Sequence, residues 1–238
     1  MRKEPNYLYL MLGMLCGVVL ITSASPFSRL SILVIFLAAL SLLVTAYILT
    51  ERKRELMLAG LLGASALLPF AWFSIHRGEL SQRVAQAVYS VNLAFWLVFT
   101  LYVGLMVFRA IMNARRIREN EVYGAIYVYL LIGVLFAEVY QLLLAWRPDA
   151  LYFDPGRFGA PHLIAGSLYT RGAGEVVYYS FVTLATVGYG DVTPSSPLAR
   201  SVSLVEAVVG IMYVATMIAR FVSIHTNREN RGSEREEL

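Results

Sequence analysis

The sequence predicts an all-α membrane protein with six transmembrane helices and one short re-entrant helix that leads into a loop. Of its 238 residues, 58% are hydrophobic and only 15% are charged, whereas soluble domains carry about a quarter charged residues. The apolar residues gather in blocks of about 20 or more, the length of helix that crosses a bilayer core. Because lipid offers no hydrogen bonds to an open backbone, each block should be helical.

Six apolar blocks are the predicted membrane-spanning helices. The apolar run of the first block is too long for a signal peptide, so we predict a retained helix. Its Gly13 and Gly17 have the spacing of a close helix-packing face, although glycine is also common in membrane helices in general. Cys16 is the single cysteine of the chain, so no intrachain disulfide can form. The predicted helices are residues 7–25, 30–49, 56–75, 85–112, 122–146 and 199–223.

The basic residues predict the orientation of these helices, because cytoplasmic loops are enriched in lysine and arginine. With the N-terminus in the cytoplasm, most basic residues fall in cytoplasmic segments, and the net charge of +4 needs no nucleic-acid partner. We therefore predict a multi-pass protein of the cell (plasma or inner) membrane with both termini in the cytoplasm. The cytoplasmic basic residues would be Arg2, Lys3, Arg52, Lys53, Arg54, Arg109, Arg115, Arg116, Arg118, Arg220, Arg228, Arg231 and Arg235.

Between the fifth and sixth blocks the composition changes twice. Residues 147–174 are rich in proline and glycine, which predicts an extracellular loop. Residues 175–185 are apolar but only half as long as a spanning helix, which favours a segment that enters the membrane and returns. The predicted organisation is a four-helix membrane domain (1–112), a charged cytoplasmic linker (113–121), a second membrane domain (122–224) and a short cytoplasmic tail (225–238).

The re-entrant segment ends in the motif T-x-x-T-V-G-Y-G-D, which runs from Thr183 to Asp191. A dehydrated cation needs a cage of oxygens, which successive backbone carbonyls can supply if they point the same way. Such a backbone requires dihedral angles that side chains resist, and Gly188 and Gly190 remove that penalty.

The motif and its position resemble the pore of tetrameric potassium channels, over residues 122–223. The resemblance implies a pore domain of outer helix, pore helix, selectivity-filter loop and inner helix. It implies a homotetramer in the lipid bilayer that conducts K⁺ passively, without enzymatic activity and without a cofactor, K⁺ being the permeant ion. The residues that it implies for ion binding are Thr186, Val187, Gly188 and Tyr189, with Gly190 completing the filter.

The same resemblance implies residues that support the filter. Tyr178 and Tyr179 stand where many relatives carry two tryptophans, and their hydroxyls could reach Asp191; both could instead be aromatic residues of the membrane interface. Thr183 begins the motif and completes this supporting set. Val182 occupies a place that is a glutamate in some bacterial channels, which sets this chain apart from them.

The sixth predicted helix carries the candidate gating residues. Gly210 stands where many potassium channels have a glycine at which the inner helix bends; it could equally serve close helix packing. Beyond it, one face could form the cavity wall and gate. That face comprises Ile211, Val214, Ala215, Ile218 and Val222.

Two acidic residues lie within predicted membrane helices, where charge is costly and usually faces protein or water. For Glu138 a packing contact is the favoured interpretation. For Glu206 a packing contact and a pH-dependent brace behind the filter are equally plausible, because it lies within reach of the pore helix.

Residues 1–112 resemble a voltage-sensor-like module without its arginine ladder. A voltage-gated subunit is the first alternative function, but the fourth block carries only Arg109, whereas voltage sensing needs several arginines. A potassium transporter subunit is the second, but such chains carry four degenerate filter loops and this chain carries one. For an enzyme, the sequence offers no constellation of catalytic residues.

Overall fold

The computed structural model describes residues 6–23, 60, 82–114, 118–158, 162–164, 168–170 and 173–236. The predicted helices 30–49 and 56–75 lie outside the described residues, apart from Gly60. The described part is mostly helical, with short strands between two of the long helices. Its helices are α1 (Tyr7–Ser23), α4 (Gln82–Asn113), α5 (Glu119–Trp146), α6 (Pro155–Phe158), α7 (Ala173–Leu184) and α8 (Pro197–Glu236). Its strands are β1 (Leu151–Phe153), β2 (His162–Ile164), β3 (Leu168–Thr170) and β4 (Val192–Pro194).

Three described helices are long and apolar enough to cross a membrane: Gln86–Asn113, Glu119–Trp146 and Pro197–Ile224. They coincide with the predicted fourth, fifth and sixth helices. The apolar part of α1, Tyr7–Leu20, is shorter. The short apolar helix expected at 175–185 is α7, which begins and ends within two residues of that range.

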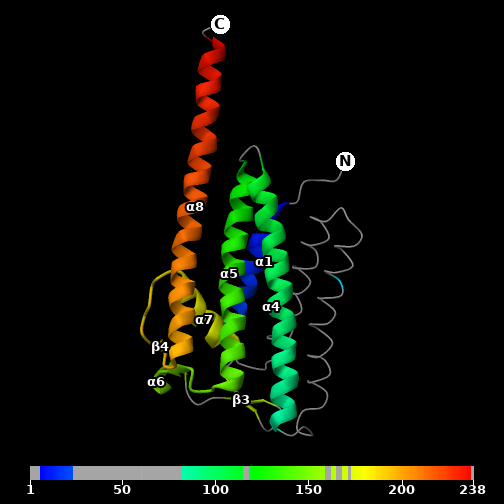
Figure 1. Ribbon diagram of the computed structural model, residues 1–238, viewed down its shortest axis with the longest axis vertical. Coiled ribbons are helices and arrows are strands. Elements are labelled where there is room, and N and C mark those ends of the chain that lie inside the picture. The colour runs from blue at the N-terminus through cyan, green and yellow to red at the C-terminus, as the bar shows by residue number, and fades with distance from the viewer. Residues whose placement is uncertain are drawn as a thin grey trace.

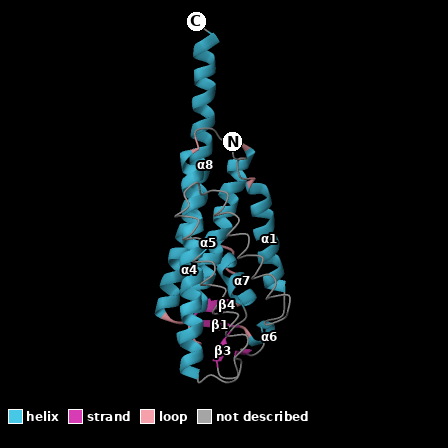
Figure 2. Ribbon diagram, turned by 90° about the vertical axis from the view of Figure 1, so that its right-hand side faces the viewer, coloured by secondary structure: helices cyan, strands magenta, loops and turns pink. Residues whose placement is uncertain are grey.

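The long helices lie side by side along the length of the molecule (Figures 1 and 2). α4 and α5 form an antiparallel hairpin, and α1 packs against both α5 and α7. α8 contacts α5 and α7, and its C-terminal part extends well beyond the ends of α4 and α5 (Figure 1).

Two boundaries differ from the sequence prediction. The linker expected at 113–121 is shorter, because α4 continues to Asn113 and α5 begins at Glu119. The backbone N–H of Arg118 donates to the carboxylate of Glu121 at 2.7 Å, and acidic residues in a first turn favour a helix start. The tail expected at 225–238 is largely helical, because α8 continues to Glu236.

One apolar core joins α1, α4 and α5. Its fully buried members include Phe99, Val103 and Val107 of α4 and Tyr127 of α5. At one end of this core the backbone N–H of Tyr7 donates to Oδ1 of Asn120 at 2.8 Å. The start of α1 and the start of α5 are thereby held together.

A second apolar core joins α5, α7 and α8 to the strands. β1 pairs antiparallel with β4, with Tyr152 opposite Thr193, so the segment after α5 is bonded to the segment that follows the motif. The region expected to be an irregular loop therefore contains ordered elements. The buried members of this core are Ala137, Tyr140, Leu144, Ala150, Leu151, Phe153, Val176, Val177, Tyr179, Val192 and Ala199.

The glycines of the helices differ in how much space surrounds them. A Cβ added to Gly13 or Gly17 would meet nothing within 4 Å, so the described residues give no support for a close packing face at that spacing. At Gly133 of α5 a Cβ would lie 2.7 Å from the ring of Phe181. The absence of a side chain at Gly133 therefore lets α7 approach α5.

Candidate functional site

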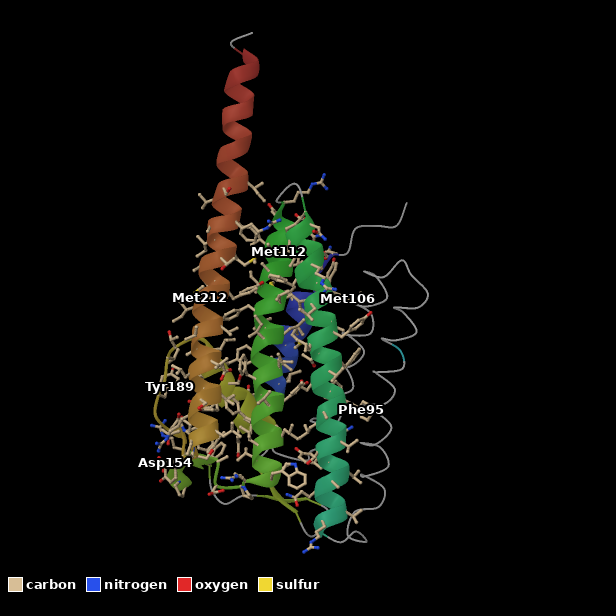
Figure 3. All side chains as sticks on the ribbon, in the orientation of Figure 1. Phe95, Met106, Met112, Asp154, Tyr189 and Met212 are labelled. Atoms are coloured by element: carbon tan, nitrogen blue, oxygen red, sulfur yellow. The ribbon has the colours of Figure 1, made fainter. Side chains whose placement is uncertain are left out.

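The motif residues after α7 lie on the surface of the single chain. Residues 185–190 are all exposed, and the side chains of Val187 and Tyr189 are 51% and 68% exposed. Tyr189 lies beside α8, on the side of the molecule away from α4 (Figure 3). This segment is held in place by α7 before it and by β4 after it.

The backbone of the motif alternates in conformation. Thr186, Gly188 and Gly190 have positive φ angles of 57°, 57° and 80°, while Val187 and Tyr189 do not have positive φ. In a strand with negative φ throughout, successive carbonyls point to opposite sides, whereas alternation in the sign of φ turns them to the same side. A β-branched residue such as Thr186 rarely adopts positive φ, and such strain is typical of functional sites.

The N–H groups and the carbonyl groups of this backbone differ in their hydrogen bonding. The N–H groups of Thr186 and Val187 donate to the carbonyls of Thr183 and Val182, each at 2.9 Å. Within the described part of the chain, no protein group donates to the carbonyl oxygens of residues 186–190. These carbonyl oxygens therefore keep both lone pairs unbonded within the described part of the chain.

Asp191, directly after the motif glycines, is the centre of a supporting network. Its Oδ2 accepts from the hydroxyl of Tyr178 at 2.7 Å and lies 3.4 Å from Nη1 of Arg157. The ring of Tyr178 stacks on that of Tyr189, with centroids 6.5 Å apart and planes 4° apart. The contact predicted between Tyr178 and Asp191 is present, and Arg157 is an additional member that the sequence did not indicate.

The hydrogen bonds of this network favour ionised Asp191. Burial alone would raise the pKa of its carboxyl, but the Tyr178 hydroxyl, the backbone N–H groups of Asp191 and Val192, and nearby Arg157 outweigh burial. The pKa of Asp191 consequently lies below its ordinary value.

Tyr179 does not reach Asp191, which corrects one of the two proposed contacts. Its hydroxyl lies 2.7 Å from Oγ of Ser203 on α8. Neighbouring residues of a helix point about 100° apart, so Tyr178 faces the motif while Tyr179 faces the inner side of α8.

Glu206 lies in the same buried region and is fully buried. Its Oε2 accepts from the hydroxyl of Tyr140 at 2.7 Å, and its Oε1 lies 2.5 Å from Oγ of Ser180. One carboxyl on α8 therefore contacts α5 and α7 together.

The remaining residues of the candidate gating set lie on α8. A Cβ added to Gly210 would fall well inside contact distance of the carbonyl oxygen of Leu184 and lie 3.0 Å from its Cδ1. This favours the packing interpretation of Gly210 over the hinge. The predicted gate face is exposed in the single chain: Ile211, Val214, Ala215, Ile218 and Val222.

Glu138 faces α4, on the opposite side of α5 from the motif. Its Oε1 accepts from the hydroxyl of Thr100 at 2.9 Å, while its Oε2 is buried without a partner among the described residues. One turn further along α5, Nε2 of Gln141 is also buried, and no group in the described part of the chain bonds it. These contacts agree with a packing role.

Arg220 is a residue that sequence reasoning missed. Its Nη2 donates to the carbonyl of Met112 at 2.7 Å, to that of Ala114 at 3.1 Å and to that of Ile111 at 3.2 Å. The guanidinium thereby joins α8 to the C-terminal end of α4. Its position in the sequence indicated only a basic residue next to the membrane.

Comparisons with known proteins place this geometry in context. A family model described as "Ion channel" matches residues 163–227, which include α7, the motif and most of α8. The chain is 35% identical over 54 residues to "Two pore potassium channel c" of Oryza sativa subsp. japonica, a match that covers 23% of this chain and 12% of that protein. It is 41% identical over 49 residues to "Probable potassium channel protein 2" of Methanocaldococcus jannaschii, which covers 19% of this chain and 14% of that protein.

The chain thus matches only a small part of the length of these relatives. The matches nevertheless support a potassium channel family for this chain, as the motif had indicated. The match to an ion channel model, together with three helices in the described part of the chain that are apolar and long enough to cross a bilayer, suggests a membrane protein.

Proposed function

We infer that this chain, whose relatives are potassium channels, is one subunit of a homotetrameric channel that conducts K⁺ selectively and passively across the membrane. The observation that carries the proposal is the backbone of residues 186–190, where φ alternates in sign and the carbonyl oxygens accept no hydrogen bond from the described residues. Carbonyl oxygens in such rows replace the hydration shell of K⁺ in selectivity filters. The carbonyls of Thr186, Val187, Gly188 and Tyr189 would bind the permeant ion, and Gly190 would close the filter.

Four copies are proposed because one chain supplies only one edge of each coordination ring. A closed cyclic oligomer brings identical edges to one axis. The apolar residues exposed along α8 and the exposed side chains of Val187 and Tyr189 are then covered by neighbouring copies or face the pore. Such residues on α8 include Leu204, Val205, Val208, Ile211, Met212 and Ile218.

The proposed topology has six spans, with α7 as the re-entrant pore helix. The start of α1 lies beside the start of α5, and α8 contacts the end of α4 through Arg220. The start of α1 and the C-terminal part of α8 therefore lie at the same end of the molecule, which supports placing both termini on one side. The distribution of basic residues favours the cytoplasm for that side.

The test is ion flux through the full chain reconstituted in liposomes. We expect a reversal potential that follows the K⁺ gradient and ignores the Na⁺ gradient. Gly188→Ala should abolish selective current: although a Cβ meets nothing within 4 Å in the single chain, Gly188 has a φ of 57°, a conformation that costs an L-residue about 1–2 kcal/mol.

The matched control is Gly17→Ala, where the added Cβ also meets nothing within 4 Å but φ is not positive. It should conduct like the unchanged protein. Equal permeability to Na⁺ and K⁺ would contradict selectivity, and a native mass that corresponds to a monomer or dimer would contradict the tetramer.

A further inference from the structure

The carboxyl of Glu206 is the meeting point of three helices. Glu206, Ser180 and Tyr140 are all fully buried. Ser180 belongs to α7, which leads directly into residues 185–190, and Tyr140 belongs to α5.

Ser180 has more partners than its single proton can serve. Its Oγ lies 2.7 Å from the carbonyl oxygen of Gly133 and 2.5 Å from Oε1 of Glu206. A serine hydroxyl has one O–H to donate, and a backbone carbonyl can only accept. If Ser180 donates to Gly133, the proton between Ser180 and Glu206 must come from the carboxyl.

The other protons of the cluster are already assigned. The hydroxyl of Ser203 donates to the carbonyl of Ala199 at 2.8 Å, so the proton between Ser203 and Tyr179 comes from Tyr179. The Tyr140 hydroxyl lies 2.7 Å from Oε2 of Glu206 and 3.1 Å from Oγ of Ser203, so we assign its proton to the nearer oxygen, that of Glu206. With these assignments, and with Ser180 bonded to Gly133, the contact between Glu206 and Ser180 requires a proton from the carboxyl.

An ionised Glu206 would leave two defects. The oxygens of Ser180 and Gly133 would face each other without a proton between them, and a buried charge would have only two hydroxyl donors. Buried charges are normally paired, yet within the described residues no lysine, arginine or histidine forms an ion pair with Glu206.

We propose that Glu206 carries a proton, donates it in a hydrogen bond to Ser180 Oγ, and is thereby a positioning residue for the filter segment 185–190. Its action through the filter rests on the function proposed above. The protonated carboxyl leaves Ser180 free to bond α5 at Gly133, so α5, α7 and α8 are fixed together. Loss of the proton turns the Ser180 hydroxyl toward Glu206, breaks the bond to Gly133 and loosens α7 from α5.

The titratable groups that face Glu206 are tyrosines. α5 contributes Tyr140 and Tyr129, and α7 contributes Tyr179. On α8 itself, Ser203 lies one turn before Glu206 and is not titratable. Within the described residues no histidine or second carboxyl faces the site, so a response of this cluster to mild alkali reports on Glu206.

The proton is tested by infrared difference spectroscopy on the reconstituted full chain. We expect the carbonyl stretch of a protonated carboxylic acid at neutral pH, absent from Glu206→Gln and lost from the unchanged protein on alkalinisation. Glu138→Gln is the matched control, because Glu138 is also a buried acid of a membrane helix but contacts Thr100 on α4 instead. A neutral-pH spectrum with no acid band that depends on Glu206 would overturn the proposal.

A second variant keeps the spectroscopic test decisive if Glu206→Gln assembles poorly. Ser180→Ala removes the acceptor of the proposed bond, so the Glu206 acid band should move to higher frequency while that of Glu138 stays in place. A Glu206 band that is unmoved by Ser180→Ala would contradict the hydrogen bond.

The positioning role is tested by K⁺ flux as a function of pH. Raising the pH removes the proton, so the flux of the unchanged protein should fall by about tenfold, the effect of losing one buried hydrogen bond. Glutamine reproduces the donor and acceptor of the protonated acid, so Glu206→Gln should conduct with no such fall, while Glu138→Gln should keep it. Identical pH profiles for Glu206→Gln and the unchanged protein would overturn the role.

The two proposals fail differently. Absence of K⁺ flux in every variant would contradict the proposed function, while the acid band would still decide the protonation of Glu206. Normal flux without a Glu206 acid band would contradict this inference alone.

Discussion

Nη2 of Arg220 donates to the carbonyl oxygen of Met112 at 2.7 Å, so the C-terminal end of α4 is bonded to α8. The same nitrogen also contacts the carbonyls of Ile111 and Ala114. The last carbonyls of a helix have no partner within it and carry a partial negative charge. A guanidinium supplies these carbonyls with both hydrogen-bond donors and a positive charge. Arg220 lies beyond the candidate gate residues Ile211 and Ile218 along α8.

Replacing Arg220 by glutamine should therefore loosen the end of α8 from α4. Hydrogen bonds to charged groups contribute about 1.5–3 kcal/mol, so we expect a lower midpoint of thermal unfolding and a changed open probability. Unfolding of the purified protein and single-channel recording would measure the two effects.

Arg109→Gln is the matched control for Arg220→Gln, since Arg109 is an exposed cation of α4 near the same end. It should leave both quantities unchanged. If Arg220→Gln behaves like Arg109→Gln, the contact with α4 has no energetic importance.

The sequence predicted those parts of the fold that follow from short-range rules. The places of α4, α5 and α8 follow from the length of apolar helix that crosses a bilayer. The positive φ at Gly188 follows from the residue type, because glycine adopts such dihedral angles without steric cost. Such rules need only neighbouring residues, so one sequence suffices to apply them.

The contacts that the sequence did not reveal join residues far apart in the chain. Arg220 binds backbone carbonyls of α4, and every residue has such a carbonyl, so no pattern marks its partner. Tyr178 and Tyr179 are equivalent in the sequence, and only the rotation of α7 decides that Tyr178 reaches Asp191. Strands β1 and β4 form by pairing with each other although they lie far apart in the sequence, and no local pattern indicates that pairing.

Tyr178→Phe should remove a hydrogen bond that supports Asp191, the residue directly after the proposed filter. The hydroxyl of Tyr178 bonds Asp191, whose pKa lies below its ordinary value. A depressed pKa stabilises the folded protein at neutral pH, and the contribution is lost as the pH falls through the folded pKa. Without the hydroxyl that pKa rises, so acid should reduce the current at a higher pH than in the unchanged protein.

The acid limb of the pH–current curve measures this shift. Tyr152→Phe is its control, because Tyr152 is an exposed tyrosine on β1, which pairs with the strand directly after Asp191. Superimposable acid limbs for Tyr178→Phe and Tyr152→Phe would show that the Tyr178 hydroxyl does not hold Asp191 ionised.

Gly210→Ala distinguishes a packing glycine from a hinge. A Cβ at Gly210 collides with the Leu184 carbonyl at the end of α7, and overpacking of this kind costs about 1–3 kcal/mol. We expect reduced thermal stability and impaired K⁺ selectivity, because α7 leads into the filter. Gly104→Ala is the control, since its Cβ would lie 3.9 Å from Leu131 Cδ1. A variant of Gly210 with normal stability and selectivity but altered open probability would favour the hinge.

The last prediction is that voltage has little effect on opening. Each charge that crosses the membrane field contributes about 2.3 kcal/mol per 100 mV, and α4 carries arginines only near its ends, Arg83 and Arg109. Residues at the ends of a spanning helix cross little of the field. α4 is also bonded to α5, since Gln86 Nε2 donates to the carbonyl of Ala145 at 2.6 Å and the Tyr89 hydroxyl to Gln141 Oε1 at 2.9 Å.

Displacement of α4 along α5 would break these bonds and the buried contacts of Phe99 and Val103, so the helix is built as a scaffold. Open probability should change only slightly over about 100 mV in single-channel recordings, a span that would move a multi-charge sensor decisively. Arg109→Gln should leave that response unaltered. A steep conductance–voltage curve with an effective charge of several units would contradict the prediction, and loss of that steepness in Arg109→Gln would identify α4 as a sensor.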